Sequence, residues 1–396
     1  MSKQSDVIIV GAGMVGLALA LGLQRLGLKV RVLEKTLLAD TQHADHRVSA
    51  LNLASERMLR HLGVWDLIAA RQPYRQMQVW EQDAHSRLSF SADELLQPAL
   101  GHIVANQAVV EALFQALQSS GTEVRYGCEP LQVEASAEGV SVRLEHDTLQ
   151  AALLVSAEGA HSRLRAHYHF PMLEWDYGHT ALVATIATAL PHEACARQVF
   201  LPSGPLALLP LPDAHHCSIV WSLPPQEAQA LLALDAPAFA HRVSVASDMV
   251  LGMCQLLTPR QSFPLRARMA RDLLRGRCLL VGDAAHTIHP LAGQGVNLGL
   301  MDAAAIIEAF ARLPSGSQWD GELAFLQPTL RWRKTEAAQM LAGMEGIKQL
   351  FATGGVVPPL RQLGMAALQR SPALKRRLMR IAMGLDGELP LMARGG

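Results

Sequence analysis

The sequence predicts an α/β fold with a parallel-sheet domain, a second domain of antiparallel strands inserted into it, and a C-terminal helical segment. Three observations support this. An apolar strand, a glycine-rich turn and a helix open the chain, a second strand and glycine-rich turn recur near residue 282, and strand-like runs broken by Pro, Gly and Asp lie between them. We expect the parallel-sheet domain at 1–75, 100–173 and 262–335, the inserted domain at 76–99 and 174–261, and the helical segment at 336–396.

The composition is that of a globular protein without excess charge. Of 396 residues, 50% are hydrophobic and 18% charged, with 35 basic and 35 acidic side chains. The apolar fraction excludes disorder as the main state, and the charge balance argues against a dedicated nucleic-acid binder. The mean hydropathy of +0.15 is high for a soluble protein and points to an apolar substrate, a partner surface or a membrane.

The cysteines and the longest uncharged run bear on the cellular compartment in which the protein works. Five cysteines form no CxxC pair, which predicts reduced thiols rather than a disulfide framework or a zinc site. The uncharged run 7–23 is at the short limit for a membrane span and is punctuated by glycines. We therefore expect a cytoplasmic protein whose contact with the inner membrane, if any, is peripheral.

The start of the chain has the pattern of a Rossmann-like unit. Residues 6–10 form a short apolar, β-branched run, as expected of a buried parallel strand. Residues 17–26 carry apolar side chains at helical spacing, and 29–33 are expected to form a second strand. This order of strand, helix and strand predicts the beginning of a nucleotide-binding sheet.

Three glycines and one acid in this unit predict dinucleotide binding. Gly11, Gly13 and Gly16 form a G-x-G-x-x-G turn between the strand and the helix. Gly11 allows the tight turn, Gly13 lets a pyrophosphate approach the backbone, and Gly16 lets the helix pack close to the strand. Glu34 ends the second strand, where an acid meets ribose hydroxyls and repels a 2′-phosphate. The alternative is a glycine-rich turn in an ordinary α/β unit.

A second glycine-rich turn at a helix start lies far along the chain. A predicted buried strand at 277–281 leads into Gly282 and Asp283, and a glycine cluster at 293–299 precedes small and apolar residues at helical spacing. A nicotinamide-dependent dehydrogenase needs only one such turn. Flavin adenine dinucleotide (FAD) is longer and can use one turn for each end, so the two turns together favour FAD.

The second turn resembles a known flavin motif. The run 282–286 (Gly-Asp-Ala-Ala-His), Pro290 and the run 293–297 (Gly-Gln-Gly-Val-Asn) are similar to the second FAD motif of the group A aromatic hydroxylases. These are single-component FAD monooxygenases with a para-hydroxybenzoate-hydroxylase-like fold. The string 286–299 and the segment 47–50 (Arg-Val-Ser-Ala) narrow the resemblance to the ubiquinone-biosynthesis hydroxylases of that family, and it covers essentially the whole chain.

The resemblance implies where the cofactor binds. In the family, the aspartate at the position of Asp283 contacts the ribityl chain, and the arginine at the position of Arg47 lies near the flavin and its phosphates. The alternative for Arg47 is a surface cation that caps the next helix. A polar residue at the position of Asn106 lies against the flavin chain, and the second helix start places positive partial charge near the ring edge that becomes anionic on reduction. The expected cofactor-binding residues are therefore Gly11, Gly13, Gly16, Glu34, Arg47, Asn106, Gly282, Asp283, Pro290, Gly293, Gln294, Gly295, Val296 and Asn297.

The same resemblance implies the reaction. NADPH or NADH reduces the FAD, O₂ adds as a flavin C4a-hydroperoxide, and one oxygen is transferred to the ring of a polyprenylphenol in ubiquinone biosynthesis. The implied carbon becomes C5 of ubiquinone (2-polyprenylphenol 6-hydroxylation). No metal-ligand spacing or catalytic triad order stands out, so we expect no metal and expect the flavin to supply the chemistry. His286, His289 and Pro290 are the catalytic candidates, and a structural role near the turn is the alternative for both histidines.

One segment departs from the family pattern. The family has Gly-Ala-Asp-Gly followed by a serine and an arginine, whereas residues 156–159 of this chain are Ser-Ala-Glu-Gly. In the family this segment is linked to the handling of FAD and NAD(P)H. The longer side chain of Glu158 puts efficient reduction by NADPH in doubt, and the alternative is a conservative exchange without effect.

The tail carries a charge pattern of its own. From 346 to 385 there are seven basic and no acidic residues, with apolar residues interleaved. A basic amphipathic segment of this kind lies on anionic lipid or on an acidic partner, such as a neighbour in a multiprotein ubiquinone-biosynthesis complex. The alternative is a terminal helix docked on its own domain with a solvated basic face.

Two other functions remain open. A sister hydroxylase of the same family would act at another ring position or on a soluble phenol. A protein of another class would hold FAD only as a scaffold subunit of a biosynthetic assembly, as the altered segment at 156–159 allows.

Overall fold

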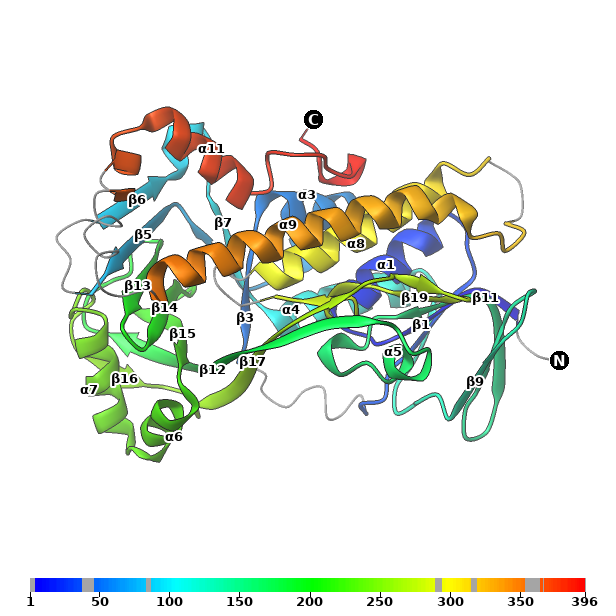
Figure 1. The fold of residues 1–396 in the computed structure, drawn as a ribbon, viewed down its shortest axis with the longest axis horizontal. Helices are drawn as coiled ribbons and strands as arrows, with labels where there is room; N and C mark the ends of the chain where they lie inside the picture. The colour runs from blue at the N-terminus through cyan, green and yellow to red at the C-terminus, as the bar shows by residue number, and fades with distance from the viewer. Residues whose placement is uncertain are drawn as a thin grey trace.

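The computed structural model describes residues 4–37, 46–82, 87–288, 294–314, 319–352, 364–365 and 367–395, without the side chains of residues 294 and 350–352. Two large sheets lie toward opposite ends of an elongated molecule, and the long helix α9 (Gln327–Ala352) runs across both (Figure 1). The predicted fold class, with a Rossmann-like parallel sheet, a second sheet and C-terminal helices, is confirmed.

The first sheet holds the start of the chain. Its path is β18-β19-β11-β1-β2-β8, and the pairs from β19 to β8 are parallel. Strand β1 (Gln4–Val10) lies in the middle of this sheet, and its apolar side chains are buried from Val7 to Val10. The other strands of this sheet are β2 (Val30–Leu33), β8 (Glu123–Arg125), β9 (Gln132–Ala135), β10 (Val140–Arg143), β11 (Thr148–Ser156), β18 (Leu274–Arg275) and β19 (Cys278–Leu280).

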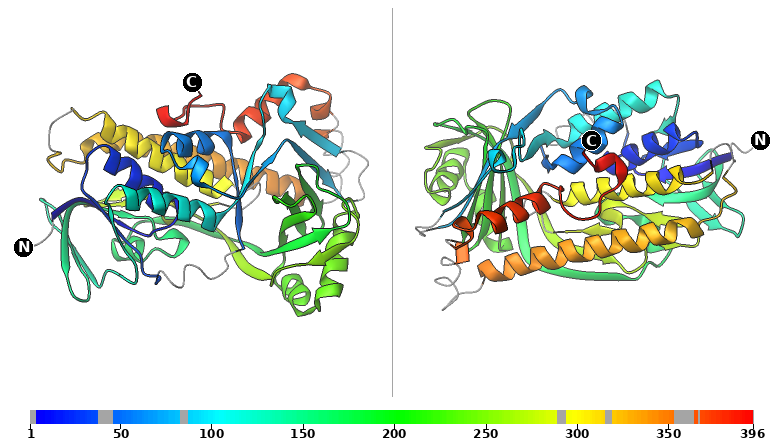
Figure 2. Two further views of the ribbon diagram at one scale, coloured as in Figure 1. Left: turned by 180° about the vertical axis from the view of Figure 1, so that it is seen from behind. Right: turned by 90° about the horizontal axis from the view of Figure 1, so that it is seen from above.

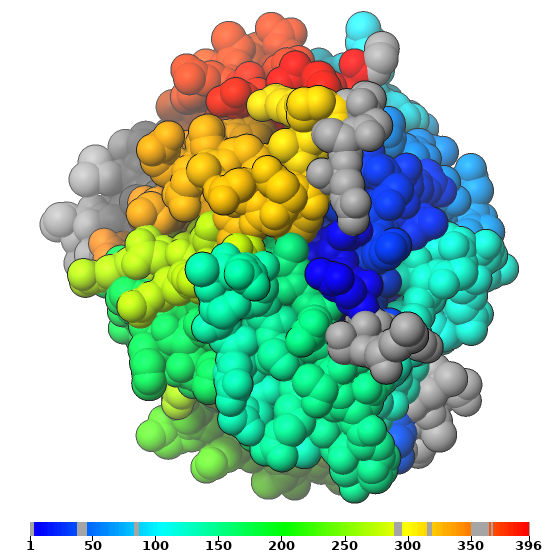
Figure 3. Space-filling view, turned by 90° about the vertical axis from the view of Figure 1, so that its right-hand side faces the viewer, coloured from blue at the N-terminus to red at the C-terminus, as the bar shows by residue number. Residues whose placement is uncertain are grey.

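Helices cover this sheet and extend its core. Helix α1 (Met14–Arg25) is buried from Gly16 to Leu23, and it contacts both α4 (Asn106–Ser119) and α8 (Gln294–Ala311). Figure 3 shows this end of the molecule, where the blue start of the chain lies between the green segment around β9 and β10 and the yellow-to-orange segment that follows α8. The buried side chains of the sheet and these helices form one continuous apolar core.

A small sheet connects the two large ones. It consists of β3 (Val48–Leu51), β7 (Gly101–Ala105) and β4 (Arg71–Tyr74), all antiparallel, with β7 in the middle. Helix α3 (Leu53–His61) follows β3 and is capped by Asn52, whose side chain accepts a hydrogen bond from the backbone N–H of Ser55.

The second large sheet forms the inserted domain. Its path is β20-β17-β12-β15-β14-β13-β5-β6, and β16 pairs with β12. The sheet is antiparallel, as predicted, except at one place, where β5 and β13 pair in parallel as the segment 76–99 joins the main insert. The strands are β5 (Gln76–Glu81), β6 (Arg87–Ser91), β12 (Met172–Thr188), β13 (Cys195–Leu201), β14 (Gly204–Pro210), β15 (His216–Leu223), β16 (Cys254–Leu256), β17 (Gln261–Ala270) and β20 (His286–Thr287).

One face of this sheet is covered by helices and the other faces the small sheet. Helices α6 (Pro225–Ala233) and α7 (Ala236–Ala246) share an apolar cluster with the sheet's outer face. The expected boundary at 262 falls inside β17, because β12 and β17 are long strands that run between the two large sheets (Figures 1 and 2).

The described part of the C-terminal segment holds helices and ends in an irregular return segment. After α9, helix α11 (Pro372–Ala382) packs beside β5 and β6, and the chain then returns to α3 and α8 (Figure 2). Among the described residues, no helix combines the length and apolar character needed to cross a bilayer.

Candidate active site

The first glycine-rich turn is shaped by close backbone packing. Gly11 has a φ of +111°, and a Cβ on it would lie 2.3 Å from the carbonyl oxygen of Ala157. A Cβ on Gly16 would lie 2.1 Å from the carbonyl oxygen of Gly11. Gly13 differs from both, because its position at the N-cap of α1 leaves nothing within 4 Å of a Cβ. Gly11 and Gly16 thus serve the fold, whereas Gly13 keeps open space for a ligand.

An acid stands at this turn, as the sequence predicts. One carboxylate oxygen of Glu34 accepts a hydrogen bond from the backbone N–H of Ala12 at 2.8 Å, and the other accepts from that of Thr36 at 2.9 Å. The side chain is half-buried. Each oxygen still has a lone pair for a further donor, such as a ribose hydroxyl.

The second turn lies directly against the first. Gly282 has a φ of +59° in the short 3₁₀ turn Gly282–Ala284. A Cβ on Gly282 would lie 3.2 Å from the side chain of Val15, and one on Gly299 would lie 2.8 Å from the same side chain. The starts of α1 and α8 and the turn after β19 therefore meet around Val15, so one extended ligand can reach both turns.

Asp283 lies in the second turn, directly after Gly282. Its side chain is accessible to solvent, although the surrounding protein partly desolvates the carboxyl. Burial raises the pKa of this carboxyl, while the charges of His286 and Arg47 oppose the rise. A Cβ on Gly295, in the first turn of α8, would lie 4.0 Å from an Asp283 oxygen. Arg47 also lies 5.4 Å above the ring of Phe263, a residue of β17, so it stands between the cleft and the second sheet.

A buried ionic network holds the second turn in place. Asp302 of α8 accepts hydrogen bonds from His286 Nε2 at 2.6 Å, from Arg333 Nε at 3.0 Å and from the backbone N–H of Gly282 at 3.2 Å. All three side chains are buried. Burial alone disfavours the carboxylate, but His286 and Arg333 outweigh it and lower the pKa of Asp302. His286 Nδ1 is buried and has no partner among the described residues, so the ring's one hydrogen bond is to Asp302. This geometry favours the structural role of His286.

The segment that departs from the family pattern forms a network behind the first turn. Glu158 accepts hydrogen bonds from Ser156 Oγ at 2.9 Å, from Ser162 Oγ at 2.6 Å and from the backbone N–H of Leu164 at 3.0 Å, at the start of α5 (Arg163–His167). The two departures, Ser156 and Glu158, therefore contact each other. Arg165 of α5 donates to the carbonyl of Ala284 at 3.0 Å, which ties this segment to the second turn.

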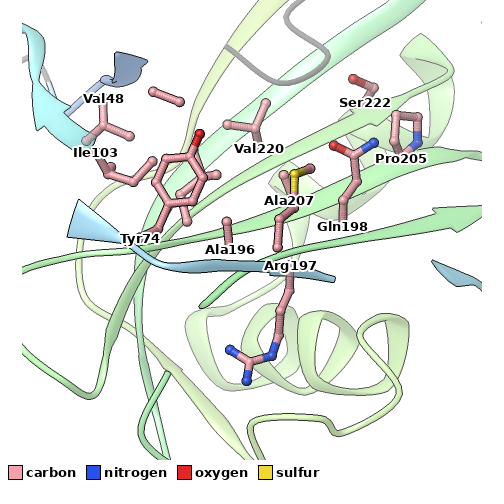
Figure 4. Close-up of a pocket in the computed structure, with 13 residues that line it drawn as sticks. Val48, Tyr74, Ile103, Ala196, Arg197, Gln198, Pro205, Ala207, Val220 and Ser222 are labelled. Atoms are coloured by element: carbon pink, nitrogen blue, oxygen red, sulfur yellow. The ribbon is translucent and has the colours of Figure 1, made fainter. Parts of the chain in front are cut away.

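An apolar pocket lies between the small sheet and the second large sheet (Figure 4). Its cavity volume is about 100 Å³, and it opens partly to solvent. Val48 and Ile103 line it from the small sheet, and Ala207 and Val220 line it from the large one. Because β3 is hydrogen-bonded to the start of α8 through the carbonyl of Ala50, the pocket is a neighbour of the second turn.

Few polar groups enter this pocket. Figure 4 shows the Tyr74 ring among the apolar side chains and Gln198 and Ser222 to one side, whereas the guanidinium of Arg197 points away. Arg197 donates instead to the carbonyls of His192 and Cys195. Burial raises the pKa of Tyr74 to about 12, so its hydroxyl stays protonated at neutral pH.

Comparison with known proteins identifies the family. The sequence profile described as "FAD binding domain" matches residues 4–324, well over half of the chain. The protein belongs to this FAD-binding family. It is 34% identical to 3-demethoxyubiquinol 3-hydroxylase of Escherichia coli over 97% of this chain and 100% of that protein. It is 33% identical to "Ubiquinone hydroxylase UbiL" of Rhodospirillum rubrum over 99% of this chain and 93% of that protein.

Solved structures confirm the fold. p-Nitrophenol 4-monooxygenase of Pseudomonas putida superposes with a TM-score of 0.81 at 16% identity, covering 98% of this chain and 100% of that one. HpxO of Klebsiella pneumoniae, complexed with FAD and uric acid, superposes with a TM-score of 0.74 at 19% identity, covering 96% of each chain. The family match and the full-length relatives, rather than these structures, show that the protein is a flavin-dependent hydroxylase with FAD as cofactor. NAD(P)H is the electron donor typical of its family.

The described residues of this family member fit FAD. Open space at Gly13 and the carboxylate of Glu34 suit the pyrophosphate and ribose of the adenylate half. The exposed carboxylate of Asp283 suits a ribityl hydroxyl, and the N-terminal end of α8 supplies positive partial charge beside it. The pocket next to the second turn would receive a substrate beside the flavin ring.

The remaining expected residues differ in what the structure shows of them. Both ends of the Asn297 amide are engaged, because it accepts from Asn52 N and Ser55 Oγ and donates to the Ala50 carbonyl. Asn106 accepts from Ser49 Oγ at 2.7 Å. Their contact with the cofactor stays a prediction, as does that of Val296, which is partly buried against the core. His289, Pro290 and Gly293 lie outside the described residues, as does the side chain of Gln294.

Sequence reasoning missed several residues of this site. Asp302 and Arg333 complete the buried network, and Tyr74, Gln198 and Ser222 supply the polar groups of the pocket. A signal existed for Asp302, because it is one of two acids in an otherwise apolar helix beyond the glycine cluster. The pocket residues give no such signal, since they are separated along the chain and meet only when the strands pair.

Proposed function

We propose that this FAD-dependent hydroxylase acts on the aromatic ring of a polyprenylphenol in ubiquinone biosynthesis. We further propose that the hydroxylated carbon is the one that becomes C5 of ubiquinone, which is 2-polyprenylphenol 6-hydroxylation. The observation that carries the proposal is the apolar pocket beside the second turn, in a chain similar over its full length to proteins named ubiquinone hydroxylases. A phenol with an isoprenoid tail is apolar except at its hydroxyl, which matches a pocket with few polar groups.

The FAD supplies the redox and oxygen chemistry when it is bound. The chain's residues bind and orient it, with Glu34 on the ribose, Asp283 on the ribityl chain and Arg47 beside the second sheet. The start of α8 stabilises negative charge near the ring, because the positive end of the helix dipole lies there.

The pocket orients the substrate and limits access of water. Tyr74 keeps its proton at neutral pH, so it offers a hydrogen bond to a ring oxygen rather than acting as a base. Gln198 and Ser222 supply further donors and acceptors, and the apolar lining excludes water from the reacting carbon.

We also propose the setting in which the enzyme works. Its substrate resides in lipid, so we place the enzyme in the cytoplasm with peripheral contact at the inner membrane through residues 346–385. Seven basic and no acidic residues in that range support this contact. The same surface also suits a neighbour in a multiprotein ubiquinone-biosynthesis complex.

One finding favours a second candidate. The Escherichia coli relative is named for hydroxylation at a different position, carbon 3 of a demethoxyubiquinol. A sister activity of this kind would use the same cofactor site and the same pocket, with the ring turned so that another carbon faces the flavin.

A reconstituted reaction tests these proposals. The purified yellow protein is given NADPH, O₂ and a 2-polyprenylphenol with a short tail, and the product is analysed by mass spectrometry and NMR. Substrate-stimulated NADPH oxidation with hydroxylation at the C5 precursor carbon supports the proposal, and hydroxylation elsewhere supports the sister activity. A flavin that responds to neither NADPH nor phenol overturns both and supports a scaffold role. Deletion of the gene, followed by identification of the accumulating quinone precursor, gives the ring position independently.

A further inference from the structure

Helix α11 has an exposed apolar stripe on its outer side. Leu374, Leu378 and Ile381 are 50%, 41% and 48% exposed. Their spacing of four and three residues places them on one face of the helix. Large apolar side chains left in water at this density usually mark a surface that another phase or molecule covers.

The inner side of the same helix is fixed to the wall of the substrate pocket. Met379 is buried in an apolar cluster that also includes Tyr74 and Met77, two residues that line the pocket. Buried Lys375 forms an ion pair with Glu94 at 2.7 Å. Helix α11 therefore packs on its own domain with one face, while none of the described residues covers the stripe on the other (Figures 1 and 2 show the position of the helix).

The exposed side is strongly basic as well as apolar. Arg376, Arg377 and Arg380 are exposed within α11, and Arg370 is exposed just before it. No acidic residue occurs between 346 and 385 to neutralise them. Guanidinium groups bind phosphate oxygens well, and apolar side chains between them suit the boundary between lipid headgroups and acyl chains.

A second exposed apolar area serves as a comparison. Val245, Met249, Met253 and Leu257 are exposed around the end of α7 and β16. This area has no run of arginines, and Asp248 lies within it. Apolar exposure and excess positive charge coincide at α11 but not at this second area, which makes anionic lipid the occupant that fits α11.

We propose that the outer face of α11 lies on an anionic phospholipid bilayer and that the polyprenyl tail of the substrate reaches the pocket past this helix. The docking step rests on α11 alone, whereas the route of the tail rests on the function proposed above. Because α11 shares its inner apolar cluster with Tyr74 and Met77, a bilayer on its outer face lies next to the pocket wall. The tail then passes from acyl chains to apolar side chains with little exposure to water.

Vesicle flotation tests the docking step. The full-length FAD-loaded protein is mixed with vesicles of phosphatidylcholine alone or with a third of phosphatidylglycerol, and the bound fraction is measured. We expect binding to the anionic vesicles, and at least a tenfold loss of the bound-to-free ratio in the triple variant Leu374→Ser, Leu378→Ser, Ile381→Ser. Replacing Arg376, Arg377 and Arg380 with Gln should weaken binding by roughly fivefold per charge and reduce its dependence on salt.

Matched controls make the result specific to α11. The variant Met249→Ser, Met253→Ser removes equally exposed apolar side chains from the second area and should bind vesicles as the unchanged protein does. Thermal melting and FAD content establish that each variant is folded. No binding to anionic vesicles, or equal loss in the control variant, overturns the docking proposal. Loss of a protein partner in the α11 variants without any vesicle binding also overturns it and assigns the face to protein contact.

A second measurement separates this inference from the proposed function. Turnover is compared for a short-tailed phenol in solution and a long-tailed phenol embedded in anionic vesicles. We expect the α11 triple variant to keep the first activity within twofold and to lose at least tenfold of the second. Equal activity of the variant on both substrates overturns the tail route while the proposed function stands. Vesicle binding without hydroxylation of either phenol overturns the function and the tail route but supports the docking step.

Discussion

The two turns of the cofactor cleft meet at Val15, but different interactions hold them. The first turn, at 11–16, is fixed by backbone contacts, since Gly11 and Gly16 leave no room for a Cβ. The second, after β19, is fixed by the carboxylate of Asp302, which binds a backbone N–H, His286 and Arg333. The conformation of the first turn is therefore determined by close backbone packing of residues near each other in the chain. That of the second depends on ionic hydrogen bonds between residues from three segments far apart in the chain.

Removal of the Asp302 carboxylate should destabilise the second turn more than any other single substitution. Asp302→Ala leaves Arg333 and His286 buried without their acceptor, which costs about 3–5 kcal/mol for a buried pair. We expect the free energy of unfolding, from denaturant titration, to fall by that amount and FAD to be lost on gel filtration. Arg312→Ala, which removes the half-exposed Glu308–Arg312 pair at the C-terminal end of α8, should cost less than about 1 kcal/mol. Equal losses in the two variants would show that the buried network does not hold the turn.

Two glycines of the first turn should respond in opposite ways. Gly11→Ala forces a side chain into the left-handed region and against Ala157, and we expect a loss of about 2–3 kcal/mol in the free energy of unfolding. Gly13→Ala has space around its Cβ and an ordinary φ of −79°, so its stability without FAD should change by less than about 1 kcal/mol. Its affinity for FAD should nevertheless fall at least tenfold, because the methyl group occupies the approach of the pyrophosphate. Tight FAD binding by Gly13→Ala, measured by flavin fluorescence, would contradict the placement of the phosphates.

The difference between the turns explains what the sequence predicts and what it does not. Gly11, Gly13, Gly16 and Glu34 lie within one strand, helix and strand, so local spacing predicts their arrangement. The partners of Asp302 lie 16 and 31 residues away on other elements, and their meeting depends on tertiary packing. The parallel pairing of β5 with β13 could not be predicted from the sequence for the same reason, because two segments far apart in the chain meet at one sheet edge.

The pocket shows this limit most clearly. Tyr74 comes from the small sheet, while Gln198 and Ser222 come from two strands of the large sheet. Alternating patterns predict that these segments are strands, but neither register nor pairing follows from the pattern alone. The position of Glu158 was predictable from the resemblance, whereas its hydrogen bond with Ser156, the other departure from the family pattern, required the structure.

Asp283 tests whether the second turn binds cofactor rather than only supporting the fold. Because burial disfavours its charged form, Asp283→Ala should not lower the free energy of unfolding at neutral pH. Loss of a charge-assisted hydrogen bond should weaken FAD binding by roughly 1.5–3 kcal/mol, as measured by equilibrium titration of the apoprotein. Asp272→Ala, which removes another exposed aspartate, is the control and should bind FAD normally. Unchanged FAD affinity in Asp283→Ala would remove the ribityl contact from the site.

The smallest expected effect concerns pH, and it separates the two aspartates of the second turn. The pKa of Asp283 is raised, so this group takes up its proton at a higher pH than an ordinary aspartate, and the apoprotein is more stable when it is protonated. The pKa of Asp302 is lowered, so its stabilising contribution is complete at neutral pH and is lost only as the pH falls below the ordinary value of 3.8. If FAD binds the ionised form of Asp283, its dissociation constant should rise as the pH falls from 7 toward 4. The free energy of unfolding should show no loss from Asp302 in that window. Asp283→Asn should abolish this pH dependence of FAD binding and bind weakly throughout, and a profile as steep as that of the unchanged protein would assign the titration to another group.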